Sequence, residues 1–469
     1  MSLLEEAFRG RMRAAPVPLP GLAPGPLLGA RGNVLRFFAD PLGLLRRVYA
    51  EHGELAALTA GRPEVVFAFG PALAKPLLND RDTFAPFITT LKSAPGSALD
   101  RLATRNLFCV DGDIHKRERA ITAPPFHRRR VEGWTRLITE LADELVSTLS
   151  PGDTVDLPHA MQGFTLAVMI RVVFGLDRTT RAEEVARLRG LLLEILERIG
   201  SPAAALLPLD VPGTPYRGLR DCAARFEAEA LRLAAVADPD SALAELRADP
   251  ADYLSGRLFG LLTAGHETTF SALSWTLALL AQHPPVLAAL TDELRPFADG
   301  EIDPEALRAL PLLDATLKES LRLFPPAAYG ARLLVRDADL GGVTLPRGAV
   351  VIFSHFVTQH MAALYPDPER FDPGRWASLR PTPYEYLPFG AGPRACPGAE
   401  FARVEMAVLL ARLLPRVWPE LVDGSRVDAR LRISLRPHPS LPVRLLPAGR
   451  APRRAHLRGT WNDCVRVPP

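Results

Sequence analysis

The hydrophobic and polar positions of this chain follow helical spacing over much of its length. Between about Arg128 and Asp314, apolar residues recur every three or four positions, as in RLITELADELVSTL and ARLRGLLLEILERI. This spacing places them on one face and predicts a series of amphipathic helices. Near the N-terminus, DPLGLLRRVYAEHG combines an Asp-Pro start, helical spacing and a final glycine, which predicts another helix. A last helix is predicted from Ala399 to Leu414.

Strand patterns are shorter and fewer. AALTAGRPEVVFAFG holds two short apolar runs with a turn between them, which predicts a hairpin. A second strand-like region extends from Ala331 to Phe356, and LRISLRPHPSLPVRLLP, beyond the last helix, predicts short strands and turns. The expected fold is therefore mainly α with a minor β part, in the α+β class.

The two ends of the chain differ from its middle. The first 30 residues are expected to form a lead-in, because Pro16 to Leu28 is rich in proline and glycine and favours extended backbone. Residues 448–469 carry arginines and prolines without an apolar period, so a loosely ordered tail is expected. A length of 469 residues suits one large domain as well as several small ones.

Charge and cysteine content exclude several functions. The net charge of +3 is small and no long basic block occurs, so no nucleic-acid partner is expected. None of the four cysteines lies in a C-x-x-C pair, which excludes a disulfide framework or zinc site and favours a reducing compartment. The charged start MSLLEEAFRGRMR is no signal peptide and no run approaches a membrane span, so a cytoplasmic protein without a membrane anchor is expected.

The strongest chemical signal is LPFGAGPRACPG, residues 387–398. Gly390 and Gly398 permit tight turns and close approach to a flat group, and Arg394 supplies a fixed charge suited to a carboxylate. Cys396 opens a predicted helix, where the helix dipole and free N–H groups favour a thiolate. A single cysteine at a helix start is more often a small buried apolar residue, so its position alone is weak evidence for a metal ligand.

The complete string resembles the haem-ligand loop of the cytochrome P450 family, Phe-Gly-x-Gly-x-Arg-x-Cys-x-Gly, at every defined position. The resemblance implies that heme b is bound with the Cys396 thiolate as axial iron ligand. It also implies that Phe389, Gly390, Arg394 and Gly398 surround the cofactor.

The string AGHETT interrupts a long apolar segment. Gly265 lowers helix propensity and the threonine hydroxyls compete for backbone carbonyls, so local opening of the helix is predicted. By itself, Glu267 fits a solvated acid on an amphipathic helix. The string is similar to the family's dioxygen motif, which implies that Ala264 lies at the cofactor, that Thr268 stabilises the iron-bound peroxo group and that Glu267 relays protons. His266 occupies the variable position of that motif and receives no role.

In KESLRLFPP, Glu319 and Arg322 stand three apart and share one helix face. Such a pair is usually a surface ion pair that contributes less than about 1 kcal/mol. The family has a Glu-x-x-Arg here, joined by an arginine from a later Pro-Glu-Arg-Phe segment. The resemblance therefore implies a buried structural network of Glu319, Arg322 and Arg370.

His115 and Arg119 stand four apart and can reach one target from a single helical face. The alternative is an exposed basic face, such as Lys116 and Arg117 are expected to form. By resemblance, His115 and Arg119 contact the haem propionates, and Arg332 is a further propionate ligand. A histidine in this role is expected to make local hydrogen bonding more dependent on pH.

The resemblance extends from about Pro18 to about Leu446 and implies one domain, residues 1–469, around one cofactor. It implies a monooxygenase that uses dioxygen to hydroxylate or epoxidise an apolar small molecule. Electrons would come from a separate ferredoxin or flavodoxin, for which Lys116, Arg117 and Arg403 offer a basic docking surface. Two alternatives remain: a haem-thiolate isomerase or dehydratase that needs no dioxygen, and a haem-based sensor.

Two further expectations concern the pocket and the ligand loop. By family position, the substrate pocket is shaped by residues 87–106, 199–216, 326–331 and 436–441, most of them apolar. Pro397 follows the ligand cysteine and has no N–H to donate to the sulfur. We therefore expect a more electron-donating thiolate and a lower haem reduction potential than with isoleucine at this position.

Overall fold

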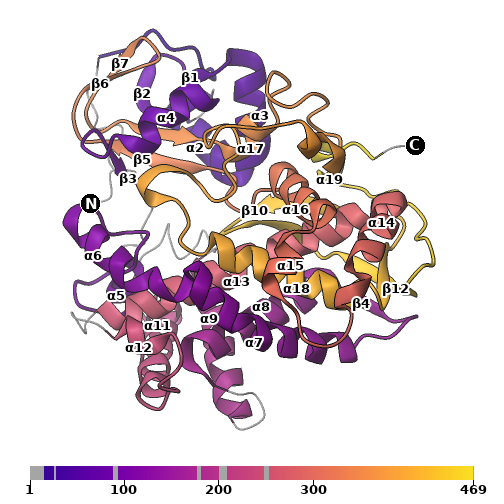
Figure 1. Ribbon diagram of the computed structural model, residues 1–469. Helices are drawn as coiled ribbons and strands as arrows, with labels where there is room; N and C mark the ends of the chain where they lie inside the picture. Colours follow the sequence, from indigo (N-terminus) through magenta and orange to yellow (C-terminus); the bar gives the residue numbers. More distant parts are fainter. Residues whose placement is uncertain are drawn as a thin grey trace.

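The computed structural model describes residues 15–25, 28–87, 93–176, 181–199, 209–247 and 253–467. Figure 1 shows a large helical part and a smaller part that is rich in strands, with the long helix α13 passing through the interior. The predicted class, mainly α with a minor β part, is confirmed.

Helices account for most of the described chain. The α-helices are α2 Ala30–Ala39, α3 Pro41–His52, α4 Pro71–Asn79, α5 Ala98–Thr104, α6 Gly112–Thr122, α7 Arg128–Ser147, α8 Leu157–Phe174, α9 Ala182–Ile199, α11 Pro215–Ala235, α12 Leu243–Leu246, α13 Leu254–Gln282, α14 Pro284–Leu294, α15 Pro304–Arg308, α16 Pro311–Leu323, α17 His355–Gln359, α18 Ala399–Leu413 and α19 Trp461–Cys464. The short 3-10 helices are η1 Pro124–Phe126, η3 Arg295–Phe297, η4 Pro373–Ala377 and η5 Gly392–Arg394.

In the described residues the strands form four small sheets. The largest has the order β1-β2-β8-β5-β3, in which β2 and β8 run parallel and the other neighbours antiparallel. Its strands are β1 Leu55–Thr59, β2 Arg62–Ala68, β3 Phe84–Pro86, β5 Gly330–Leu334 and β8 Val350–Phe353. The others are β6 Ala338–Leu340 with β7 Val343–Leu345, β10 Val427–Leu431 with β11 Leu435–Pro439, and β4 Thr154–Asp156 with β12 Pro442–Pro447 and β9 Val417–Leu421.

Local chemistry explains why the predicted elements begin and end where they do. At α3, the Asp40 side chain accepts from the Gly43 N–H at 3.0 Å, and Pro41 occupies the first turn, where no N–H is needed. At the C-terminal end of α3, Gly53 has a φ of 82°, which favours glycine. The hairpin of β1 and β2 and helix α18 likewise match the predictions, although α18 is not the last helix, because the short α19 follows it.

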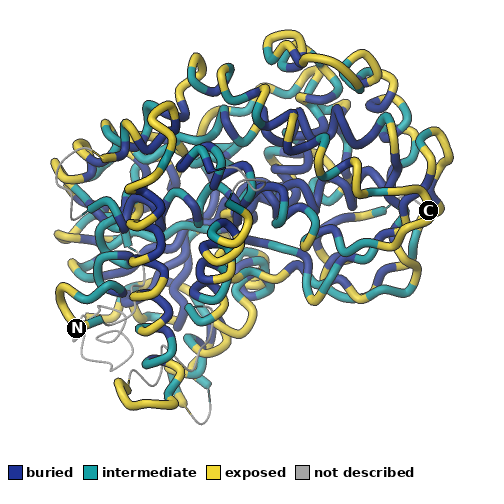
Figure 2. Tube along the Cα trace, turned by 90° about the horizontal axis from the view of Figure 1, so that it is seen from below, coloured by how far each residue is buried: buried dark blue, intermediate teal, exposed yellow. Residues whose placement is uncertain are grey.

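The core is built around α13. It packs on α8, α5, α16 and the sheets at β9 and β11, while α18 packs on α7. From residue 269 to its C-terminus every residue of α13 is buried. Buried positions gather in the interior of the tube in Figure 2, with exposed positions around the outside. A helix buried on all sides over this length forms the centre of the core.

The C-terminal tail is ordered on the core over its described residues, against our expectation. Trp461 is fully buried and stacks on Phe324 and Trp275, with ring centroids 5.4 and 5.6 Å apart. The Thr460 hydroxyl accepts from the Ala429 N–H at 2.8 Å and so links the tail to β10. The expectation of a loose tail was wrong because a few apolar residues without a period, among them Trp461, are enough to anchor a segment on an existing core.

One described helix, α8, is long and apolar enough to cross a membrane, and α13 with α14 would qualify if that bent pair were counted as one span. Of the α8 residues, 61% are buried inside the protein. Length and composition of this kind are also found in core helices of proteins without a membrane span.

Candidate functional site

The cysteine loop connects η5 to α18. The Cys396 N–H donates to the Phe389 carbonyl at 2.8 Å, which closes the loop below the helix start. Gly390 and Gly392 have φ angles of 66° and 70°, and a Cβ on Gly392 would lie 2.6 Å from the Leu78 carbonyl oxygen. Glycine is therefore required here both for the backbone conformation and for the close approach of α4.

The Cys396 side chain lies deep in the protein, yet it is exposed to a pocket. Burial raises the pKa of the thiol, whereas the Gly398 N–H, Arg119 and Arg403 act to lower it. The positive groups and the N–H donor are the surroundings that stabilise a thiolate once a metal replaces its proton. The Cys396 sulfur is thus accessible from the pocket rather than packed in the core.

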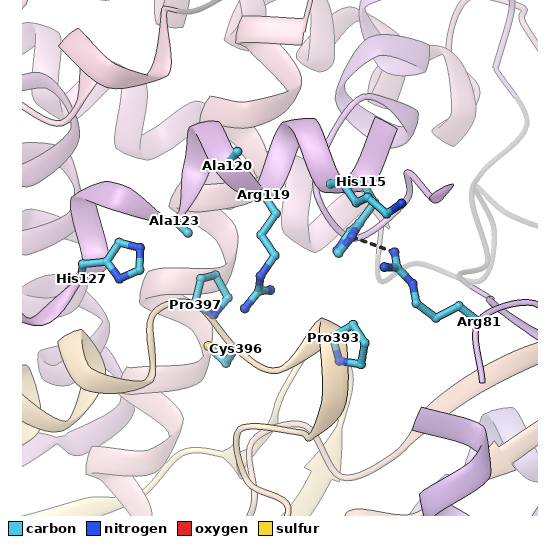
Figure 3. Close-up of a pocket in the computed structure, with 10 residues that line it drawn as sticks. Arg81, His115, Arg119, Ala120, Ala123, His127, Pro393, Cys396 and Pro397 are labelled. Carbon is cyan, nitrogen blue, oxygen red and sulfur yellow. Dashed lines mark hydrogen bonds between the residues drawn. The ribbon is translucent and has the colours of Figure 1, made fainter. Parts of the chain in front are cut away.

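The pocket beside Cys396 has a volume of about 650 Å³. Its lining residues are Arg81, His115, Lys116, Arg119, Ala120, Ala123, His127, Pro393, Cys396 and Pro397. Figure 3 shows Arg119 extending from α6 toward Cys396, with His115 beside Arg81 on the same wall. The structure therefore brings the predicted pair His115 and Arg119 to the cysteine, although they are separated from it by about 280 positions in sequence.

His115 is buried and neutral. Its Nδ1 lies 3.0 Å from Nη2 of Arg81, and since arginine can only donate, Nδ1 accepts and Nε2 carries the proton. Burial, together with Arg394, Arg81 and Arg119, lowers the pKa of His115 to about 4. The pH dependence expected at His115 therefore lies near pH 4 and not near neutrality, because the surrounding arginines disfavour a second cation.

Arginines outnumber acids around this pocket. Arg394 donates to Asp111 Oδ1 at 2.8 Å and to the Val110 carbonyl, so the carboxylate it meets in the protein is Asp111. Arg332 donates only to the carbonyls of Leu77 and Ala331 among the described residues, and burial lowers its pKa to about 10. A buried guanidinium without a carboxylate is costly, so the site fits a ligand that brings its own anionic groups.

The AGHETT segment lies in a continuous α13. The Thr268 and Thr269 hydroxyls donate to the carbonyls of Ala264 and Gly265 at 2.7 and 2.9 Å, as predicted, but the helix does not open. A Cβ on Gly265 would lie 2.3 Å from Met169 Sδ on α8. The glycine therefore serves close helix packing, and the prediction of local opening was wrong because hydroxyl-to-carbonyl bonds are compatible with an intact helix.

A stripe of α13 remains partly accessible inside the molecule. Leu261, Ala264, Gly265 and Thr268 are half-buried, and their spacing of three, one and three places them on one face. The neighbouring Glu267 is buried and turned toward the β10–β11 hairpin, where the Ser434 hydroxyl donates to its Oε2 at 3.2 Å. Burial raises the pKa of Glu267. Thr268 and Glu267 thus face different surroundings, although they are adjacent in sequence.

The buried ion network contains a different arginine from the one predicted. Arg322 binds Glu319 through two contacts of 2.9 Å, and both side chains are fully buried. The third member is Arg375, whose Nε lies 2.9 Å from Glu319 Oε1, while Arg370 contributes only its carbonyl, which accepts from Arg322. The prediction that Arg370 completes the network was wrong because the Arg370 side chain is exposed. The turn at η4 instead directs Arg375, the fifth residue of FDPGRW, back to α16.

Two of the predicted pocket segments lie partly outside the described residues, at 88–92 and 200–208. In the described remainder, α5 packs against α11 and α13 and contributes the buried Leu99 and Leu102. Residues 326–331 lead into β5, and residues 436–441 include most of β11. Of these segments, α5 and β11 pack directly on α13, the helix that carries the accessible stripe.

Comparison with protein-family models matches residues 251–439 to the family described as "Cytochrome P450". A curated relative, "Putative cytochrome P450 135B1" of Mycobacterium tuberculosis, is 30% identical over 91% of both chains. Cyclooctat-9-en-7-ol 5-monooxygenase of Streptomyces melanosporofaciens is 29% identical over 84% of this chain and 88% of that protein.

Solved cytochrome P450 structures also resemble this chain. Cyanobacterial CYP120A1 with bound retinoic acid has a TM-score of 0.78 and 26% identity, and covers 92% of this chain and 99% of its own. CYP175A1 from Thermus thermophilus has a TM-score of 0.70 and 28% identity, and covers 91% of this chain and all of its own.

Proposed function

The chain belongs to the cytochrome P450 family and is a monooxygenase, and on this premise we propose that it hydroxylates or epoxidises an apolar small molecule with electrons from a separate redox protein. The observation that carries the proposal is the placement of the accessible Cys396 sulfur and the propionate candidates His115 and Arg119 around one pocket. A thiolate and a cationic wall are what a haem with two carboxylates requires.

The proposal assigns each side chain a task. When bound, haem supplies the iron centre that activates dioxygen. Cys396 would hold the iron through its sulfur, and the Nε2–H of His115 with Arg119 and Arg332 would bind the propionates. The remaining surroundings of the macrocycle would come, by the family motifs, from Phe389, Gly390, Arg394, Gly398 and Ala264.

The proton chemistry would be divided between two neighbours on α13. The Thr268 hydroxyl lies on the accessible stripe and donates at present to the Ala264 carbonyl. During the reaction it would give up this bond and donate a hydrogen bond into the site. Glu267, whose raised pKa keeps more of it in the acid form, would supply the proton from the side of the β10–β11 hairpin.

The experiment that tests the function is product formation with and without dioxygen and with and without a reductant. A screen for compounds that shift the iron's spin state supplies the substrate. We expect product only when both dioxygen and a reductant are present. A haem-thiolate isomerase or dehydratase would form product without either, and a sensor would bind ligands without forming product.

Thr268→Ala should uncouple electron use from product formation. Losing one hydrogen bond worth about 1.5 kcal/mol corresponds to about tenfold less product per electron pair, with hydrogen peroxide released in its place. Thr269→Ala is the matched control, because that hydroxyl also binds a carbonyl four residues earlier but is buried. Equal peroxide release by the two variants would contradict the role of Thr268.

Replacing Pro397 with alanine or isoleucine should raise the haem reduction potential. Gly398 already provides one N–H toward the Cys396 sulfur, and either substitution adds the backbone N–H that proline lacks. One added hydrogen bond of about 1 kcal/mol corresponds to a rise on the order of 50 mV in a one-electron couple. Spectroelectrochemical titration measures this, and unchanged potentials in both variants would refute the argument.

We place the substrate among hydrophobic terpenoid-like molecules, steroid-like molecules or fatty acyl chains. The support is the apolar character of the pocket-shaping segments, for example Leu99 and Leu102 on α5. One related structure holds retinoic acid, an isoprenoid acid, and one relative is named for oxidation of cyclooctat-9-en-7-ol. An apolar space with few polar groups selects substrates of this kind.

We propose a ferredoxin or flavodoxin as the electron donor. Lys116 lines the Cys396 pocket and is well exposed, and Arg117 next to it on α6 and Arg403 on α18 are about half-exposed. An acidic partner surface would be attracted to these charges and aligned by them. We also propose that the chain is one domain, since the larger of two apolar clusters in the described residues includes residues from Leu22 to Val465.

A further inference from the structure

His266 is fully buried beside the proposed proton donor and has one ring nitrogen without a partner among the described residues. Its Nδ1 lies 2.6 Å from the Leu262 carbonyl oxygen. Because a carbonyl can only accept, Nδ1 carries the proton of the neutral ring. Nε2 is therefore left with a lone pair and requires a donor.

The surroundings of His266 keep it neutral. Arg189 on α9 and Arg436 on β11 are the charged groups that act on it from packed elements, and both disfavour a second positive charge. Thr165 on α8 donates to the His266 carbonyl rather than to the ring, and Phe270 stacks beside the ring. With burial, these arginines lower the pKa of His266 to about 4.

A group able to supply the missing proton is the adjacent Glu267. Its Oε1 lies 3.7 Å from Nε2 of His266, within reach of a small side-chain rotation. On its other side, Oε1 lies 3.9 Å from Arg436 Nη1 and Oε2 accepts from Ser434. The carboxyl group therefore stands between a partner that can only accept and two partners that can donate.

We propose that His266 is a positioning residue for proton delivery: its Nε2 accepts a hydrogen bond from the acid form of Glu267, while Ser434 and Arg436 receive the carboxylate form. Glu267 gives up its proton toward the site and becomes a carboxylate at the hairpin. Arg436 is 30% exposed, so water at this hairpin returns a proton to the carboxylate and restores the acid. The inference deepens the proposed function, since it rests on Glu267 as the proton source.

The chain contains an internal comparison for this arrangement. His283, at the end of α13, is also buried, lies with its Nδ1 2.7 Å from the carbonyl four residues earlier, and has an unpartnered Nε2. No carboxylate lies within 4 Å of that ring among the described residues. Of these two buried histidines, His283 is thus a packing element, whereas His266 faces an acid.

The test is an infrared titration of the holoprotein. The carbonyl stretch of protonated Glu267 is assigned by its loss in Glu267→Gln, and its pH midpoint is then measured in the wild type and in His266→Phe. Phenylalanine keeps the aromatic volume and removes the acceptor, so the acid form loses its partner. We expect the midpoint to move down by about one pH unit.

Two further variants serve as controls. His266→Gln restores an acceptor oxygen and should return the midpoint most of the way, whereas His283→Phe should leave it unchanged. A midpoint that is equal in the wild type and His266→Phe, or one that His283→Phe moves as far, overturns the proposal. If His266→Phe does not fold, His266→Ala is measured in its place against the same controls.

A second readout separates this inference from the function itself. In reduced holoprotein under air, the pH above which peroxide release rises should fall by about one unit in His266→Phe. Peroxide release with an unchanged pH profile refutes the role of His266 while the monooxygenase assignment stands. If no dioxygen is consumed at all, the proposed function fails, and the infrared midpoint still decides whether His266 holds the acid form.

Discussion

Glu319→Ala is expected to lower the free energy of unfolding by about 3–5 kcal/mol, because it strands a fully buried arginine. Glu319 accepts from Arg322 twice, from Arg375, from the Trp376 indole and from the Asp372 N–H, so one truncation leaves five N–H donors of four residues without this partner. Denaturant titration of the holoprotein measures the loss.

The matched control is Glu305→Ala. Glu305 also pairs with two arginines, Arg128 and Arg308, but its side chain is 51% exposed. Water replaces the lost partners there, so the expected cost is much smaller than for Glu319→Ala. Similar unfolding midpoints for the two variants would show that the buried network contributes no more than a surface cluster.

The same measurement decides which arginine completes the network. Arg375→Ala removes a side chain that contacts Glu319 directly and should destabilise by about 2–4 kcal/mol. Arg370→Ala keeps the carbonyl that accepts from Arg322 and removes only an exposed side chain, so a change within about 0.5 kcal/mol is expected. The reverse order would favour the prediction made from the sequence.

Predictions that depended on local chemistry were accurate. The helix at Pro41–His52 follows from an Asp-Pro start and a terminal glycine, and the β1–β2 hairpin from two apolar runs around a turn. The cysteine loop was identified by its full motif, because its glycines are needed for backbone conformations that other residues disfavour. These signals lie within about 15 neighbouring residues.

Features that depend on distant contacts were missed. Arg375 and Arg370 stand five apart, and only the turn at η4 decides which of them reaches α16. Trp461 lies in a polar tail without a period, and its burial comes from the stack with Trp275 and Phe324. The position of His266 in the motif is variable, so no pattern could indicate that its Nε2 faces Glu267.

Cys396→Ser is expected to abolish oxygen insertion, with a decrease in product formation on the order of 1,000-fold, equivalent to about 4 kcal/mol of activation free energy. A serine hydroxyl is a weaker and less electron-donating ligand than a thiolate, whose donation favours cleavage of the O–O bond. The pocket's arginines and His115 remain, so haem should still bind, although less tightly.

Spectra of the reduced carbon monoxide complex separate loss of the ligand from loss of the cofactor. Cys396→Ser should retain bound haem but lose the long-wavelength absorption that thiolate ligation produces. Cys109→Ser is the matched control, because Cys109 is a partly buried thiol near Arg394 that lies outside the pocket lining. It should keep the wild-type spectrum and activity. A wild-type spectrum in Cys396→Ser would require another axial ligand, and none of the other three cysteines lines this pocket.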